Sequence, residues 1–176
     1  MIILITVPHA ACPASREDHF CDYGAVRAAL RLERHLQKCA KLHVHFGNVD
    51  RRICDLNRRQ CYHHPWRSAI RSQFPKASLL LDVHSFPPDI DWGEYDVVLL
   101  DHAPDSEKLF NWTYEFAQAL TQAGFHIGVF KGAKNDITID ALAHDVREVF
   151  LIEFNEALSD RDLDRLTMEM SRTLCR

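Results

Sequence analysis

The sequence predicts an α/β fold, a three-layer sandwich in which a mostly parallel or mixed sheet carries helices on both faces. Two observations lead to this class. Short aliphatic runs, typical of strands buried on both faces, alternate along the chain with amphipathic segments of helical spacing. No repeat, low-complexity tract or linker divides the 176 residues. We therefore expect one domain over residues 1–176, a length that can bury a hydrophobic core.

The elements follow in a regular order. The first strand is expected over Ile2–Val7, an unbroken aliphatic run that ends at Pro8. A helix follows over 23–39, where apolar residues recur three and four positions apart and Asp22 stands at the N-cap position. A short strand over 42–46 and a short helix over 66–74 come next. The remaining strands are expected over 78–83, 95–100, 125–130 and 149–154, and the remaining helices over 106–122, 139–146 and 161–174.

The overall charge gives no general attraction to phosphate or anionic lipid. Acidic residues outnumber basic ones by 25 to 21, so the net charge is −4. The stretch 51–71 has the arginines and aromatic residues of a single-strand nucleic-acid binder, but no glycine-rich phosphate loop accompanies it. The longest apolar run, 1–8, is too short for a membrane span and lacks the features of a secretory leader. We expect a cytoplasmic protein without nucleic-acid or membrane partners.

The cysteine pattern favours free thiols. The positions are scattered, and no C-x-x-C pair marks a zinc knuckle or a redox motif. We predict that these side chains fill the interior in the reduced state. They are Cys12, Cys21, Cys39, Cys54, Cys61 and Cys175.

Two histidines at strand ends are candidate metal ligands. His9 follows the first strand and His84 ends a later one, so one sheet edge would bring the two imidazoles together. Asp82 shares a strand face with His84, where a carboxylate can support an imidazole. Two imidazoles and one carboxylate leave a fourth tetrahedral position for water, as in catalytic zinc sites. The alternative is two ordinary buried histidines.

Several residues could supply the carboxylate or another third ligand. Asp22 stands just before the first helix, where it could instead serve only as a helix cap. Glu17 and Asp18 lie in the preceding loop. Cys12 is three residues after His9, and a buried thiol is its alternative role.

The segment 51–58 could act on a substrate. Arg58 offers a planar fork for a carboxylate, and Asn57 adds donors beside it. Arg51 or Arg52 could face the site and stabilise an oxyanion, and charge alone does not choose between them. An exposed loop is the alternative for this segment.

Glu153 is the candidate general acid/base. It interrupts an otherwise apolar strand, and a carboxylate at such a position needs partners, of which a metal-activated water is one. Glu156, three residues later, is expected to be a solvated side chain.

Four segments together resemble the N-formylglutamate amidohydrolase family, a branch of the zinc carboxypeptidase-like hydrolases. They are Val-Pro-His at 7–9, Asp-Leu-Asn-Arg at 55–58, Asp-Val-His-Ser-Phe at 82–86 and Ile-Glu-Phe at 152–154. The resemblance implies a fold like that of the zinc carboxypeptidases and phosphorylase/hydrolase-like proteins. It also implies a Zn²⁺ ion held by His9, Asp22 and His84, a substrate carboxylate held by Asn57 and Arg58, Arg51 on the scissile carbonyl and Glu153 as acid/base.

The resemblance also ranks the open choices. The family has an arginine four residues before the Asp of Asp-x-Asn-Arg, which selects Arg51. Zinc carboxypeptidases have a His-x-x-Glu pair where this chain has Cys12, whereas Asp22-Tyr23-Gly24-Ala25 is similar to an acidic and small-residue segment of the formylglutamate branch. As the third ligand, the resemblance therefore ranks Asp22 first, Glu17 second and Cys12 third.

The implied activity is hydrolysis of a small acidic N-acyl amino acid such as N-formylglutamate. A metallocarboxypeptidase-like peptidase is one alternative. An inactive carboxylate-binding module of the same fold is another, which the cysteine at position 12 favours. The chain is short for the family, and the loop over 131–136 is expected to form a pocket wall.

Overall fold

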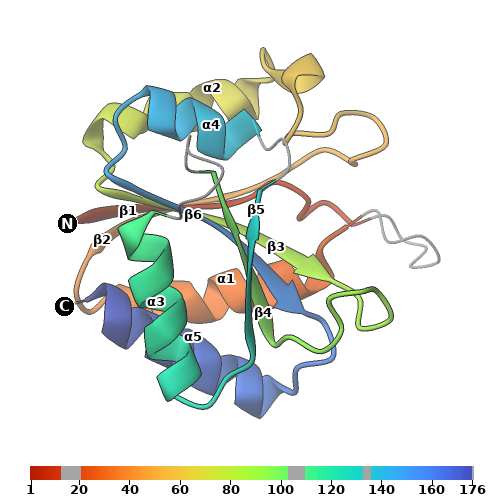
Figure 1. Cartoon of the computed structure of the whole chain (residues 1–176). Helices are drawn as coiled ribbons and strands as arrows, with labels where there is room; N and C mark the ends of the chain where they lie inside the picture. The colour runs from red at the N-terminus through yellow and green to blue at the C-terminus, as the bar shows by residue number, and fades with distance from the viewer. Residues whose placement is uncertain (13–20, 103–109, 133–135, 176) are drawn as a thin grey trace.

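The computed structural model describes residues 1–12, 21–102, 110–132 and 136–175, in which one mixed sheet lies between two helical layers (Figure 1). The strand order is β2-β1-β3-β6-β4-β5. The strands β2, β1, β3 and β6 are parallel, β4 runs antiparallel to β6, and β5 runs parallel to β4. The predicted three-layer α/β sandwich is confirmed. The strands are β1 (Ile2–Val7), β2 (Lys41–Phe46), β3 (Leu79–Phe86), β4 (Val97–Asp101), β5 (Ile127–Lys131) and β6 (Glu148–Asn155).

Three helices cover one face of the sheet and two cover the other (Figure 1). The expected helix over 66–74 is shorter than predicted and gives way to a 3-10 turn at Phe74–Lys76, where Pro75 stands. None of the described helices is both long and apolar enough to cross a bilayer. The first face carries α1 (Tyr23–Leu36), α3 (Asn111–Gln122) and α5 (Asp160–Leu174), and the second carries α2 (Pro65–Arg71) and α4 (Asp136–Ala143).

The alternation of side chains along the strands separates two apolar cores and positions the polar residues. Leu4 of β1, Leu80 of β3 and Val149 of β6 pack under α2 and α4. Two residues further along each strand, the same face carries Thr6, Asp82 and Leu151, because successive side chains point to opposite faces. Polar groups therefore replace apolar ones as β1 and β3 approach their carboxyl ends, on the α2/α4 side.

The expectation of reduced cysteines is wrong. All six form disulfides, and none is free. Spacing along the chain could not show this, because the fold brings together residues as distant as Cys39, after α1, and Cys175, after α5. Disulfides are rare in cytosolic proteins, so the cysteine pairs do not support the expected cytoplasmic location. The pairs are Cys12–Cys21, Cys39–Cys175 and Cys54–Cys61.

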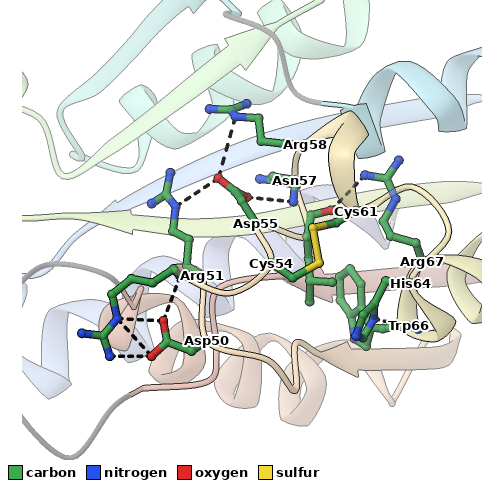
Figure 2. Close-up of a disulfide and its surroundings, with 12 residues drawn as sticks. Asp50, Arg51, Cys54, Asp55, Asn57, Arg58, Cys61, His64, Trp66 and Arg67 are labelled. Atoms are coloured by element: carbon green, nitrogen blue, oxygen red, sulfur yellow. Dashed lines mark hydrogen bonds and ion pairs between the residues drawn. A yellow bond between two sulfur atoms is a disulfide. The ribbon is translucent and has the colours of Figure 1, made fainter.

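A buried arginine fixes the loop between β2 and α2. Arg67 of α2 is 1 % exposed and donates to the carbonyl of Leu56 at 2.9 Å and to the carboxylate of Asp140 in α4 at 2.5 Å. Figure 2 shows this side chain beside the loop that the Cys54–Cys61 disulfide closes. The loop is thus held by one covalent bond and by a charged side chain that bridges two helices.

Removing the charge of Asp140 should destabilise the fold. We expect Asp140→Asn to lower the free energy of unfolding by about 2 kcal/mol, because it leaves the buried Arg67 guanidinium without its counter-charge. Asp145→Asn is the matched control, since Asp145 is exposed and its positive φ of 59° suits asparagine. Urea unfolding measures both, and equal stability of the two variants would contradict this role.

Candidate metal centre

Two imidazoles share one carboxylate oxygen at the carboxyl edge of the sheet. Oδ2 of Asp22 lies 3.1 Å from Nδ1 of His9 and 2.7 Å from Nδ1 of His84. The two rings lie 5.0 Å apart between centroids, and all three residues are buried. One donor atom from each lies within 4.8 Å of the other two, a spacing that fits a single cation.

Backbone contacts bring Asp22 to the histidines. His9 is two residues past the end of β1, and its carbonyl accepts a hydrogen bond from the amide of Asp22 at 3.0 Å. Although Asp22 is the residue before α1, its side chain makes no cap hydrogen bond, so a role only as a helix cap is wrong. A Cβ at Gly24 would lie 2.9 Å from Cβ of Ser85, hence the helix start approaches the end of β3 closely.

Each imidazole also contacts a second carboxylate through its other nitrogen. Nε2 of His9 lies 2.9 Å from Oδ1 of Asp55, and Nε2 of His84 lies 3.3 Å from Oδ2 of Asp82. Thr6 donates to the other oxygen of Asp82 at 2.6 Å. These carboxylates orient the rings so that both Nδ1 atoms face Asp22, as outer carboxylates do around metal-ligating histidines.

The donor set fits zinc. His₂-carboxylate sets with one open position are typical of catalytic Zn²⁺, and both imidazoles are already oriented by their outer partners. A divalent cation requires several donor atoms close together, and these three residues supply them within 4.8 Å of one another.

Asp22 and His84 favour their charged forms at the centre. Burial, the largest influence, raises the pKa of Asp22, but hydrogen bonds from His84 and His9 outweigh it and hold that pKa below its ordinary value. Burial lowers the pKa of His84, but the charge of Asp82, together with the hydrogen bonds that His84 donates to Asp22 and Asp82, raises it well above its ordinary value. The carboxylates of Asp22 and Asp82 thus favour positive charge at the position of His84.

Asn57 contacts one of the candidate ligands. Asn57 is 4 % exposed, and its Nδ2 lies 2.7 Å from Nε2 of His84. Among the described residues, its Oδ1 is the one buried side-chain nitrogen or oxygen that lacks a hydrogen-bond partner. When Nδ1 of His84 faces a cation, Nε2 must carry the proton, and a half-turn of the Asn57 amide would present Oδ1 as its acceptor.

Asp55 links the candidate centre to two arginines (Figure 2). Its Oδ2 lies 3.2 Å from Nε of Arg51 and 3.8 Å from Nε of Arg58. Burial raises the pKa of Asp55, but the hydrogen bond from His9 and the charges of His9 and Arg51 bring it below its ordinary value. Arg52 instead pairs with Asp50.

The three candidate ligands line a cavity of about 230 Å³. Glu153 reaches it from β6, where it pairs in register with His84 of β3. Burial is the main cause that raises the pKa of Glu153 to about 7. All seven site residues expected from the sequence line this cavity: His9, Asp22, Arg51, Asn57, Arg58, His84 and Glu153.

Some expected candidates do not reach the centre. Cys12 is bonded to Cys21, so its sulfur is not available as a thiolate ligand. Glu17 and Asp18 lie outside the described residues. Glu156 is partly buried and accepts a hydrogen bond from Ser85 at 2.7 Å, so the expectation of a solvated side chain is wrong.

Asp55 is the first residue of the Asp-Leu-Asn-Arg segment, but the sequence did not predict a role for it. The signal was its position three residues before Arg58 and four after Arg51, which places one carboxylate between two cations on a short loop. The expected pocket wall over 131–136 is not tested, because 133–135 lie outside the described residues.

The fold is similar to those of known structures. No family model matches the chain, and no curated protein matches its sequence. A gene product of Agrobacterium tumefaciens is 14% identical with a TM-score of 0.71, over 98% of this chain and 88% of that one. An N-formylglutamate amidohydrolase from Ralstonia eutropha is 16% identical with a TM-score of 0.57, over 97% and 92%. A pyrrolidone carboxyl peptidase from Thermococcus litoralis is 7% identical with a TM-score of 0.57, over 97% and 91%. At these identities the likeness concerns the fold.

Removing the charge of Asp55 should weaken zinc binding. We expect Asp55→Asn to lower the affinity for Zn²⁺ by about 10- to 100-fold, because the variant loses the carboxylate that orients His9. Asp50→Asn is the matched control in the same loop, since Asp50 pairs with Arg52. Titration of the metal-free proteins against a chromophoric chelator measures both. An Asp55→Asn protein that binds zinc as tightly as the control would contradict the orienting role.

Proposed function

We propose that this chain is a zinc-dependent amidohydrolase that cleaves a small, carboxylate-bearing N-acyl amino acid. The observation that carries the proposal is the placement of Oδ2 of Asp22 between Nδ1 of His9 and Nδ1 of His84. Such a set supplies three ligands and leaves room for a reacting oxygen. When bound there, Zn²⁺ would polarise the scissile carbonyl and make water acidic enough to react at neutral pH.

Glu153 is the group proposed to move protons. A carboxyl whose pKa is raised to about 7 can exist in both protonation states near neutral pH, as an acid/base catalyst requires. It would accept a proton from the attacking water and deliver it to the leaving nitrogen. Its place on β6, in register with His84, puts it beside the candidate ligands and inside the same cavity.

The two arginines are proposed to bind the anionic parts of the substrate. Arg51 and Arg58 both line the cavity, and both approach the same carboxylate, Asp55. The guanidinium of Arg58 would donate hydrogen bonds to the substrate carboxylate. Arg51 would donate to the oxygen of the scissile carbonyl. Asn57 would act here through its contact with His84 as well as on the substrate.

The size of the cavity favours a small substrate. About 230 Å³ is below the roughly 300–1,000 Å³ that is usual for drug-sized ligands. This supports an N-acyl amino acid over the alternative, a peptide cleaved at its C-terminus. The fold likeness to an N-formylglutamate amidohydrolase and to a pyrrolidone carboxyl peptidase supports a hydrolase in general.

The proposed acid/base is tested by Glu153→Gln. We expect the variant to bind zinc with unchanged affinity and to lose turnover by about 100- to 10,000-fold, because the amide cannot transfer the proton. Released amino acid, measured with an amine-reactive reagent on zinc-loaded protein, reports the turnover. Glu148→Gln, at the opposite end of β6, should keep the wild-type rate.

Two outcomes would contradict this account. A fully active Glu153→Gln protein would remove Glu153 from the reaction. A wild-type protein that binds no zinc would instead favour the inactive carboxylate-binding module.

A further inference from the structure

One wall of the cavity is apolar. It is formed by Trp92, from the connection between β3 and β4, by Leu100 of β4 and by Leu151 of β6. Leu100 and Leu151 are direct partners in the antiparallel β4–β6 pair. Leu151 precedes Glu153 by two residues and so shares its face of the sheet. The apolar wall therefore adjoins the proposed acid/base.

Aromatic neighbours hold Trp92 in place. Its ring stacks on Phe130 of β5, with the centroids 5.7 Å apart and the planes at 14°. It also meets Phe86 of β3 edge-on at 5.9 Å. Tyr95 contacts the same Phe130 at 5.8 Å. A ring fixed on two sides is a preformed surface, so a ligand that packs on it loses little affinity to ordering the protein.

The arginines and the apolar wall lie on opposite sides of the reacting groups. Asp55, which pairs with both arginines, contacts His9 at the end of β1. His84 and Glu153 stand on the next strands in the sheet order, β3 and β6, and the leucine pair lies across β6 and β4. In a substrate whose carboxylate binds the arginines, the acyl chain on the far side of the scissile bond would therefore lie toward Trp92.

We propose that this wall binds the acyl chain, and that the substrates are acidic amino acids carrying a short alkyl or aromatic acyl group. The inference rests on the proposed amidohydrolase function and narrows it. The oxygen of water bonds to the carbonyl carbon, the C–N bond breaks, and Glu153 passes the proton of the water to the nitrogen. The products are a free carboxylate with an apolar chain and an amino acid with a free amine.

A formyl group would leave this wall unfilled. It has no carbon beyond the carbonyl, so it cannot contact Trp92 while its carbonyl lies at the candidate centre. Each methylene buried against an apolar surface should raise kcat/KM about fourfold, the equivalent of its transfer free energy of about 0.8 kcal/mol. Butanoyl substrates, with three carbons beyond the carbonyl, should therefore exceed formyl substrates by more than tenfold.

The experiment compares formyl, acetyl, butanoyl and benzoyl derivatives of glutamate on the zinc-loaded full-length protein. Release of glutamate gives kcat/KM for all four in one assay. Calorimetry of the same compounds with Glu153→Gln protein gives their affinities without turnover. We expect both quantities to rise from formyl to butanoyl, and the benzoyl compound to bind at least as tightly as the acetyl compound.

Three variants test whether the apolar wall causes the preference for longer acyl groups. Trp92→Ala should lower kcat/KM for the butanoyl substrate at least tenfold while changing the formyl substrate less than threefold. Trp92→Phe should retain most of the wild-type preference. Leu100→Ala, which widens the wall at a partly exposed position, should shift the preference toward the benzoyl substrate even if Trp92→Ala fails to fold.

The outcomes separate this inference from the proposed function. A formyl substrate that is cleaved as fast as the butanoyl one would overturn the acyl-chain inference and leave the amidohydrolase standing. An unchanged acyl profile in Leu100→Ala and Trp92→Ala would also overturn it. Failure of the zinc-loaded protein to cleave any of the four compounds would contradict both proposals.

Discussion

The buried carboxylate of Asp22 is the group around which the rest of the site is arranged. A negative charge in the interior is costly unless it is paired, and Asp22 is paired by the imidazoles of His9, just past β1, and His84, in β3. His9 and His84 are 75 positions apart in the sequence, but the parallel strands β1 and β3 are neighbours and end at the same edge. The pairing of Asp22 therefore requires that the sheet is assembled. Asp22 in turn lines the cavity beside the two histidines.

Disulfides lie close in sequence to the residues of the centre. Cys12 and Cys21, near His9 and Asp22, are bonded to each other, and Cys54–Cys61 closes the loop that carries Asp55. Short closed loops have few conformations in the unfolded chain, so they lose less entropy when they take up one geometry. The packing of α2 and α4 adds the buried Arg67 beneath the loop that carries Asp55. Covalent closure and a buried ion pair thus act on the same residues that orient His9.

Much of the fold could be read from the sequence because local patterns specify it. Aliphatic runs such as 2–7 and 149–154 predicted strands to within a residue or two, and the polar residues at their ends predicted where a site would form. The cysteine pairs could not be read, because Cys39 and Cys175 meet only when α1 and α5 pack together. Asp55 was missed because its partner His9 lies 46 positions away in the sequence, and Trp92 because its contact with Phe130 depends on the order of β4 and β5.

The most direct test of the centre is a crystal of the protein grown with equimolar zinc and measured on both sides of the zinc absorption edge. The account predicts one strong anomalous peak within bonding distance of Nδ1 of His9, Nδ1 of His84 and a carboxylate oxygen of Asp22, with a position left open toward Glu153. A peak held by other residues, or none at these three, would contradict the assignment of the centre.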